Sequence, residues 1–581
     1  MTRFEVWAPR AQTVELDLGG ARRELQQASG GWWALEAPEV GAGSDYAYRV
    51  DGSDPTPDPR SRWQPAGVHG PSRTYDPGAY AWGDGQWRGL ALPGAVVYEL
   101  HVGTFTAEGT LDAAIERLDH LVALGVDAVE VLPVAAFPGR HGWGYDGVHL
   151  YAVHEPYGGP EAFARFVDAC HARSLGVVVD VVYNHLGPSG NYLGRFGPYF
   201  TDRHATPWGA AVNLDDDGAY EVRRWIVDNA RMWLRDYHVD GLRLDAVHAL
   251  VDDSALHLLE ELAGEVDALA AELNRPLFLI AESDLNDPRL VTPVEAGGYG
   301  LSAQWSDDFH HALHTLLTGE GQGYYADFAA QPYEALRRTL TRAYFHDGTW
   351  SSFRGRRHGR PVDAHRTRAY RFVGYLQDHD QVGNRALGER ISATMSAGRV
   401  RIGAALVLTS PFTPMLFMGE EWAASTPWQY FTDHQEPDLA EAVRQGRRRE
   451  FAEHGWAEGD VPDPQDSATV RRSTLDWAEP GREPHAATLR WYRELLALRR
   501  AHPELTDPRL ERTDVSYDDQ AGWLVVRRGD VRVVCNLARE AQQVPIDVPG
   551  SAVLLASDAA TALCGNTVML PAESVAVLTT A

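Results

Sequence analysis

The chain contains no lysine: Lys and Arg together number 53 in 581 residues, and every one of them is arginine. This absence excludes enzymes that form a Schiff base through a lysine, and it excludes the phosphate-binding lysine of a P-loop. Cysteine is nearly as scarce, with Cys170, Cys535 and Cys564 and no C-x-x-C spacing. Such a set indicates neither a disulfide framework nor a zinc site.

Long hydrophobic runs are also missing. Residues 1–5 lack the apolar segment of a secretory signal peptide. The longest apolar run, 402–418, is interrupted by Ser410, Pro411 and Pro414, so it does not read as a membrane span. The sequence therefore predicts a cytoplasmic protein.

Positive charge is in deficit, because 81 acidic residues against 53 basic ones give a formal net charge of −28. A balance of this size repels the phosphates of nucleic acids and the head groups of anionic membranes. It argues against both as partners and suits a neutral ligand. Otherwise, 44% hydrophobic and 23% charged residues are typical of a globular protein.

Three segments differ in rhythm. Residues 1–90 alternate with period two between glycine pairs, which predicts an N-terminal, carbohydrate-binding-like β-sandwich. Residues 91–502 alternate strands with helices and predict a catalytic barrel with long loop insertions. Residues 503–581 return to short strands and predict a C-terminal antiparallel β domain. Four aromatic residues of the first segment would either stack on sugars or pack a core: Trp32, Trp33, Tyr46 and Tyr48.

The middle segment has the pattern of a parallel sheet covered by helices on both faces. For example, Leu111, Ile115, Leu118 and Val122 share one helical face, with Thr110 as a candidate N-cap. Eight parallel strands close a (β/α)8 TIM barrel, so we expect a multidomain α/β protein built around one. The predicted strands are 96–100, 126–132, 177–182, 242–244, 277–281, 302–305, 372–376 and 414–418.

Acids, imidazoles and one guanidinium lie at the ends of these strands, and the carboxyl ends of barrel strands build an active site. A metal site is disfavoured because the fixed charge of Arg243 repels a cation and no H-E-x-x-H spacing occurs. A Ser-His-Asp triad is disfavoured because no G-x-S-x-G turn occurs. The strand-end residues are Asp180, His185, Arg243, Asp245, Glu282, His379 and Asp380.

Glycoside cleavage fits this set, because it needs one carboxyl group that donates a proton and another that stays ionised, about 5 Å apart in retaining enzymes. The fixed charge of Arg243 favours the ionised form of Asp245, as a nucleophile requires. Glu282 follows an apolar strand, so burial and neighbouring carboxylates favour its protonated form, as a general acid requires. The other groups could bind hydroxyls or stabilise oxocarbenium charge: Asp380, His185 and His379.

In order and spacing, four of these strand ends match the four motif regions of the α-amylase glycoside hydrolase family, at 180–185, 241–245, 279–282 and 376–380. The chain resembles this family along nearly its whole length. The resemblance implies that Asp245 is the nucleophile, Glu282 the acid/base and Asp380 the transition-state stabiliser. It also implies substrate binding at four positions: Arg243, His185, His379 and Tyr145.

Several loops are most similar to one branch of this family, which cleaves the α-1,4 bond next to the terminal trehalose of maltooligosyltrehalose and releases trehalose. These loops are 207–209, 305–311, 353–356 and 428–434. They suggest four more substrate-binding residues, although loop packing and capping would explain the same residues. The branch also implies no cofactor, no metal and a pathway shared with a maltooligosyltrehalose synthase. The four residues are Trp305, Asp307, Trp428 and Asp433.

One residue departs from the family's pattern, because Asp378 stands where asparagine is usual and adds a carboxylate near the site. Three alternatives stay open: a glycogen branching enzyme, an isoamylase-like debranching enzyme and a non-catalytic glucan-binding protein. The catalytic residues do not separate hydrolysis from glycosyl transfer. The intact set Asp245, Glu282 and Asp380 argues against a binding protein.

Overall fold

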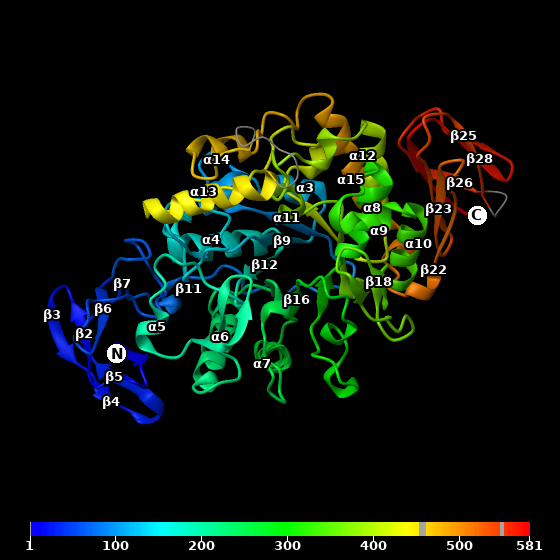
Figure 1. Ribbon diagram of the computed structural model, residues 1–581. Coiled ribbons are helices and arrows are strands. Elements are labelled where there is room, and N and C mark those ends of the chain that lie inside the picture. Colours follow the sequence, from blue (N-terminus) through cyan, green and yellow to red (C-terminus); the bar gives the residue numbers. More distant parts are fainter. Residues whose placement is uncertain (1, 453–460, 547–550, 581) are drawn as a thin grey trace.

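A computed structural model describes residues 2–452, 461–546 and 551–580. A closed barrel forms the centre of the molecule, with one group of β-sheets at each end (Figure 1). The N-terminal sheets lie at the end drawn in blue, and the C-terminal sheets lie at the opposite end, drawn in red (Figure 1). Within the described ranges, no helix has both the length and the apolar character needed to cross a membrane.

The barrel contains eight parallel strands, and the prediction of a TIM barrel is confirmed. All eight predicted strands are present, with ends that differ by at most two residues, because each is an apolar run buried on both faces. In barrel order the strands are β8 (Val97–Leu100), β9 (Ala128–Val131), β12 (Gly176–Val181), β15 (Gly241–Leu244), β16 (Phe278–Ala281), β17 (Ala303–Trp305), β20 (Phe372–Tyr375) and β21 (Thr413–Phe417).

Helices surround the barrel, and all of the longer ones except α13 (Pro437–Ala452) bury apolar side chains in the main core. In α4, Cys170 is fully buried, as the helical pattern predicts. The longer helices are α4 (Gly159–His171), α6 (Ala219–Asp236), α7 (Leu258–Leu273), α8 (Asp307–Thr318), α10 (Pro332–Arg342), α12 (Ala397–Leu408), α13 (Pro437–Ala452) and α15 (His485–Ala501).

The first predicted helix is two helices, α2 (Leu111–Ile115) and α3 (Leu118–Leu124). Thr110 caps α2 as expected by accepting a hydrogen bond from the Ala113 amide at 3.2 Å. The inward position of Val122 is wrong, because its side chain is 44% exposed. The chain leaves the helical path at Arg117, which rotates α3 so that Leu121 faces the core instead.

The N-terminal segment forms two antiparallel sheets, in the orders β1-β5-β4 and β3-β2-β6-β7. Trp33, Tyr46 and Tyr48 are buried in their shared core, so these aromatic residues serve packing. The strands are β1 (Arg3–Trp7), β2 (Val14–Leu18), β3 (Ala21–Glu24), β4 (Gln26–Gln27), β5 (Trp32–Glu36), β6 (Asp45–Val50) and β7 (Ser72–Arg73).

The C-terminal segment also forms two antiparallel sheets, in the orders β22-β23-β24-β29-β26 and β25-β28-β27. The exact domain limits at residues 90 and 502 stay predictions. The strands are β22 (Thr513–Asp518), β23 (Trp523–Arg528), β24 (Val531–Asn536), β25 (Gln542–Pro545), β26 (Ala552–Ala556), β27 (Ala562–Cys564), β28 (Thr567–Leu570) and β29 (Ser574–Thr579).

Long insertions connect the barrel strands. Two of these insertions contain β-hairpins that the sequence pattern does not predict. The segment after β12 contains β13 (Phe200–Thr206) paired with β14 (Gly209–Val212). The segment before β20 contains β18 (Thr349–Ser351) paired with β19 (Arg356–His358). After β20, the short helix α11 (His379–Gly383) begins at once.

Candidate active site

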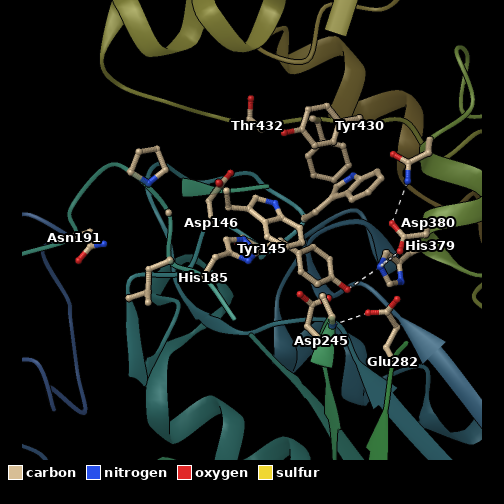
Figure 2. A pocket seen from close by; sticks show the side chains of 18 of the residues that line it. Tyr145, Asp146, His185, Asn191, Asp245, Glu282, His379, Asp380, Tyr430 and Thr432 are labelled. Carbon is tan, nitrogen blue, oxygen red and sulfur yellow. Dashed lines mark hydrogen bonds and ion pairs between the residues drawn. The ribbon is translucent and has the colours of Figure 1, made fainter. Parts of the chain in front are cut away.

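A cavity of about 790 Å³ opens at the carboxyl ends of the barrel strands. Figure 2 shows Tyr145, Asp245, Glu282, His379 and Asp380 gathered at one side of it, while Tyr430 and Thr432 come from a loop on another side. Side chains from distant parts of the chain therefore meet in one pocket. Six of the predicted site residues line it: Tyr145, His185, Asp245, Glu282, His379 and Asp380.

The Asp245 carboxylate follows β15 and is held by two donors. Nη1 of Arg243 lies 2.7 Å from one oxygen, and Nδ2 of Asn184 lies 2.8 Å from the other. Arg243 is fully buried, with its guanidinium 4.3 Å from the centre of the Trp305 ring. The charge-assisted bond from buried Arg243 and the amide bond from Asn184 together fix the orientation of the carboxylate.

The Glu282 side chain lies in a different environment, at the end of β16. Burial and the nearby carboxylates of Asp245, Asp307 and Asp380 raise its pKa well above the ordinary value, although Arg243 acts against them. The backbone N–H of Ala246 donates to its Oε2 at 2.6 Å. Ala246 has a φ of 37°, a left-handed conformation that is costly outside glycine and that directs this N–H to the carboxyl group.

The phenol of Tyr145 joins two strand ends. Its OH donates to Oδ2 of Asp180 at 2.6 Å and lies 2.8 Å from Nε2 of His379, over whose ring it stacks. Asp180 is buried, which raises its pKa to about 6 against the opposing charge of Arg243. The Tyr145 ring thus lines the cavity in a fixed orientation, as a platform for a sugar ring requires.

His185 and Asp380 complete the part of the cavity nearest the strand ends. His185 contacts the side-chain oxygen of Asn184 through Nδ1 and the Tyr145 carbonyl through Nε2, at 3.0 Å for the latter. The Asp380 carboxylate is 45% exposed, lies 3.7 Å from Nε2 of His379, and accepts a 3.2 Å bond from Asn384. It is therefore open to a ligand in the cavity.

A metal could be held, among the described residues, by one cluster away from this cavity: His204, Asp215 and Asp253. Nε2 of His204 lies 2.9 Å from Asp215, and Arg203 lies within 4.0 Å of both carboxylates. The fixed charge of Arg203 opposes a cation there. The expectation that the protein needs no metal stays a prediction.

Comparisons with known proteins agree with this geometry. Residues 76–197 match the family model described as "Alpha amylase, catalytic domain", and residues 508–577 match a "Domain of unknown function". A crystal structure of a putative α-amylase from Salmonella typhimurium is 40% identical, with a TM-score of 0.91, covering 99% of this chain and 97% of that chain.

Two curated proteins named malto-oligosyltrehalose trehalohydrolase match nearly the whole chain. That of Arthrobacter ramosus is 60% identical and covers 94% of both chains. That of Rhizobium sp. strain M-11 is 54% identical over 99% of this chain and 97% of its own length. The chain belongs to the malto-oligosyltrehalose trehalohydrolase family. It is thus an α-amylase-type glycosidase, as the strand-end motifs predict.

The other predicted binding residues of this family member lie behind the cavity or beside it. Trp428 is fully buried, stacks on Trp143 at 4.4 Å between ring centroids, and so presents no face to a sugar. Trp305 is 2% exposed and packs against Arg243. Neither tryptophan lines the cavity, because both side chains are buried behind the residues that do.

The two predicted loop carboxylates are bound to protein groups. Tyr375 donates to Asp307 at 2.5 Å, and burial raises the pKa of Asp307 to about 6. Asp433 accepts the backbone N–H of Arg140 at 2.7 Å and a bond from Gln435. Capping and packing account for both side chains in the structure, and substrate contact by them stays a prediction.

Sequence reasoning missed three residues that shape the site. Asn184 holds Asp245, and the only signal for it was its place beside His185. Trp208 lines the cavity, 50% exposed, and stacks over His185 with ring centroids 4.6 Å apart. Tyr430 lines the cavity from the loop before α13. The last two lie in loops 207–209 and 428–434, whose resemblance to the family branch was the signal, but which side chain of each loop lines the cavity depends on how the insertions fold.

Asp378, the departure from the family's pattern, is the N-cap of α11 and accepts the Gln381 amide at 2.8 Å. Burial and the carboxylate of Glu99 raise the pKa of Asp378 well above its ordinary value, while His379 acts against them. A protonated Asp378 is close to asparagine in shape and charge. This accounts for its tolerance at a position where the family usually has the amide.

Proposed function

We propose that the protein hydrolyses the α-1,4-glucosidic bond adjacent to the terminal trehalose of maltooligosyltrehalose, with retention of configuration, and releases trehalose. The observation that carries the proposal is the pair of unlike carboxyl groups at neighbouring strand ends, in a chain 60% identical to a named trehalohydrolase. The ionised carboxylate of Asp245 and the proton-bearing Glu282 match the two roles of a retaining glycosidase.

In the first step, Asp245 attacks C1 of the glucose on the maltooligosyl side of the bond. Glu282 donates its proton to the leaving oxygen, so that trehalose departs neutral and a glycosyl-enzyme ester forms. In the second step, Glu282 accepts a proton from water, which attacks the same carbon and frees the maltooligosaccharide and Asp245. The donors on Asp245, Arg243 and Asn184, keep the nucleophile oriented through both steps.

Four lining residues are proposed to bind the sugar at the cleaved bond. The Tyr145 ring supplies an apolar platform, while His185 and His379 supply hydrogen-bond partners for hydroxyl groups. Asp380 faces the cavity with a partly exposed carboxylate and balances the positive charge of the oxocarbenium-like transition state. Arg243 acts on the nucleophile rather than on the sugar, because it is fully buried.

Recognition of the trehalose end is assigned to the loops that wall the cavity. Trp208 and Tyr430 are two of the aromatic side chains that line the cavity there, together with Trp143, Phe200 and Phe431. Trp305 and Trp428 would act through the residues they support, and Asp307 and Asp433 would hold the loops in place. This division gives the loops the selectivity and the strand ends the chemistry.

The proposed setting is a cytoplasmic pathway in which a maltooligosyltrehalose synthase supplies the substrate. The chemistry requires such a supplier, because the α,α-1,1 bond of trehalose must be present at the chain end before the adjacent α-1,4 bond is cleaved. The net charge of −28 suits a neutral glucan ligand.

The test is product analysis of the purified protein with maltotriosyltrehalose and, separately, with maltopentaose and amylose. Rapid release of free trehalose, with slow attack on the two plain glucans, is the expected result. New branch points on amylose without trehalose release would replace the proposal by a branching transferase. Cleavage of α-1,6 bonds in a branched glucan would favour a debranching enzyme, and binding without turnover a glucan-binding protein.

A further inference from the structure

A continuous chain of polar contacts runs from the barrel interior to Asp245. Oε1 of Glu99, on β8, lies 2.5 Å from Nδ1 of His379, and Nε2 of His379 lies 2.8 Å from the Tyr145 OH. Tyr145 then donates to Asp180, whose two oxygens each lie 3.0 Å from Nη1 of Arg243. That same Nη1 lies 2.7 Å from Asp245 (Figure 2 shows the cavity end of this chain).

The direction of each hydrogen bond decides the charge of His379. Its Nδ1 faces the carboxylate of Glu99, so Nδ1 carries a hydrogen. The Tyr145 hydrogen is already given to Asp180, so the phenol oxygen accepts from Nε2, which also carries a hydrogen. With both ring nitrogens donating, the ring is an imidazolium.

Burial disfavours a charged imidazole, but the carboxylates of Glu99 and Asp380 outweigh burial and raise the pKa of His379 to about 10. The remaining sides of the ring pack against uncharged tryptophans, Trp143, Trp305 and Trp428. His101 is buried with its pKa lowered to about 3, so it adds no charge. The titratable groups that face His379 are Glu99, Glu130, Asp180, Asp378, Asp380, His101 and Tyr145.

Glu99 is bound differently from Glu130, a second buried acidic residue on a barrel strand. Its second oxygen accepts the backbone N–H of His379 at 3.1 Å, so it fixes both the ring and the start of α11. Glu130 pairs with Glu99 in the register of β8 and β9, yet neither of its oxygens has a hydrogen-bond partner among the described residues. Burial and the charge of Glu99 raise the pKa of Glu130 well above its ordinary value.

We propose that Glu99 is a positioning residue for the glycosidase reaction: it holds His379 as an oriented imidazolium donor at the cavity and anchors the contact chain that ends at Asp245. The inference rests on the proposed function for its catalytic consequence. Glu99 does not line the cavity and acts through His379. The ion pair makes the Nε2–H of His379, which the Tyr145 oxygen accepts in this structure, a charge-assisted donor at the wall of the cavity, while the pair as a whole stays neutral.

The first test is the pH dependence of kcat/KM for maltotriosyltrehalose in the wild type and in Glu99→Gln, from about pH 5 to about pH 9. Glutamine keeps an oxygen for Nδ1 but removes the charge, so we expect the pKa of His379 to fall by about 2 to 3 units, into the range of about 7 to 8. The ratio of wild-type to variant kcat/KM cancels the ionisation of Glu282. We expect this ratio to rise about tenfold per pH unit above the new pKa.

Two further variants separate charge from packing. Glu130→Gln replaces a proton-bearing carboxyl group by a neutral group of the same shape on the next strand, and its ratio to the wild type should stay flat with pH. Glu99→Asp keeps the charge, so it should keep the wild-type pH dependence even if its overall rate falls. A flat ratio for Glu99→Gln, or an equal rise for Glu130→Gln, would overturn the proposal.

The second test needs no turnover, so it separates failure of this inference from failure of the proposed function. The protein is labelled with ¹⁵N-histidine, and the His379 ring signals are identified by their loss in His379→Asn. In the wild type we expect both ring nitrogens to stay protonated at about pH 8, and in Glu99→Gln we expect the ring to titrate below that pH. A neutral ring in the wild type would contradict the proposal, whatever the enzyme does to maltotriosyltrehalose.

Discussion

The two sides of the cavity are built in different ways. At the strand ends, Asp245, Glu282 and His379 are each held by named partners on the barrel strands or directly after them, and most of those partners are buried. On the loop side, Trp208 is half exposed and stacks on His185. The hydrogen bonds and ion pairs at the strand ends fix the catalytic groups in place, as preorganised catalysis requires. The loop side chains can be substituted without disturbing those contacts. Substitutions on the two sides should therefore have different kinetic signatures.

The largest effects are expected from the two carboxyl groups. Asp245→Asn removes the nucleophile and should lower kcat at least about 10⁴-fold. Glu282→Gln removes the proton donor and should lower kcat about 10²- to 10⁴-fold on maltotriosyltrehalose. Steady-state kinetics on that substrate measure both losses.

An activated substrate distinguishes the two roles. The fluoride of α-maltosyl fluoride leaves without a proton, so Glu282→Gln should recover much of its rate of glycosyl-enzyme formation on it, while Asp245→Asn should not. If both variants lost the same fraction of their rate on both substrates, Asp245 and Glu282 would not have the separate roles of nucleophile and proton donor.

A smaller effect is expected from Asn184→Ala, which leaves the nucleophile in place but removes one of its donors. Loss of a hydrogen bond to a charged group lowers kcat about 10- to 100-fold. Asn384→Ala is the matched change, because Asn384 donates to the partly exposed Asp380, where water can replace it. Equal kcat values for these two variants would show that burial of the donors does not matter.

On the loop side, Trp208→Ala should raise KM for maltotriosyltrehalose and leave kcat nearly unchanged. Loss of one aromatic stacking surface is worth about 0.5 to 1.5 kcal/mol, which corresponds to about a 2- to 12-fold rise in KM. Trp350→Ala is the control, since Trp350 is 62% exposed and does not line the cavity. A fall in kcat comparable to that of Asn184→Ala would abolish the distinction between the two sides.

The smallest kinetic effect is expected from Asp378→Asn, because asparagine also caps helices well and resembles the protonated acid. Stability should change with pH instead. The folded pKa of Asp378 is raised, so the folded state holds a proton that the unfolded chain releases, and wild-type stability falls as pH rises above the ordinary pKa.

Asp378→Asn has no carboxyl group to ionise at this position, so it does not lose folding stability in this way as the pH rises. Its Tm should exceed that of the wild type by more at about pH 8 than at about pH 5, as a thermal melt measures. A Tm difference that is constant with pH would show that Asp378 is already ionised in the fold. In that case the resemblance to asparagine would not explain its tolerance.

The residues at the strand ends were predictable from the sequence, whereas the loop residues that line the cavity were not. Four of the barrel strands are apolar runs that lead directly into acidic or imidazole residues, so these runs locate Asp245, Glu282 and His379. Trp428 was a candidate binding residue on its loop sequence, yet it is buried and stacks on Trp143 from a distant insertion. That contact is long-range, and no local period encodes it.

The same limit applies to polar partners. Glu99 lies in the middle of an apolar strand, where its sequence gives no sign that it meets His379 across the barrel. Asn184 stands beside the predicted His185, and nothing in that position shows that its side chain donates to Asp245. In both cases the residue type was visible, but its partner is set by barrel closure.

The most direct test of the whole account is time-resolved proton NMR of maltotriosyltrehalose during hydrolysis by the wild-type protein. Retention of configuration through Asp245 predicts that trehalose and the α-anomer of maltotriose appear together, before mutarotation produces the β-anomer. Initial appearance of the β-anomer would contradict Asp245 as a nucleophile. Maltose or glucose without trehalose would contradict the assignment of the cleaved bond.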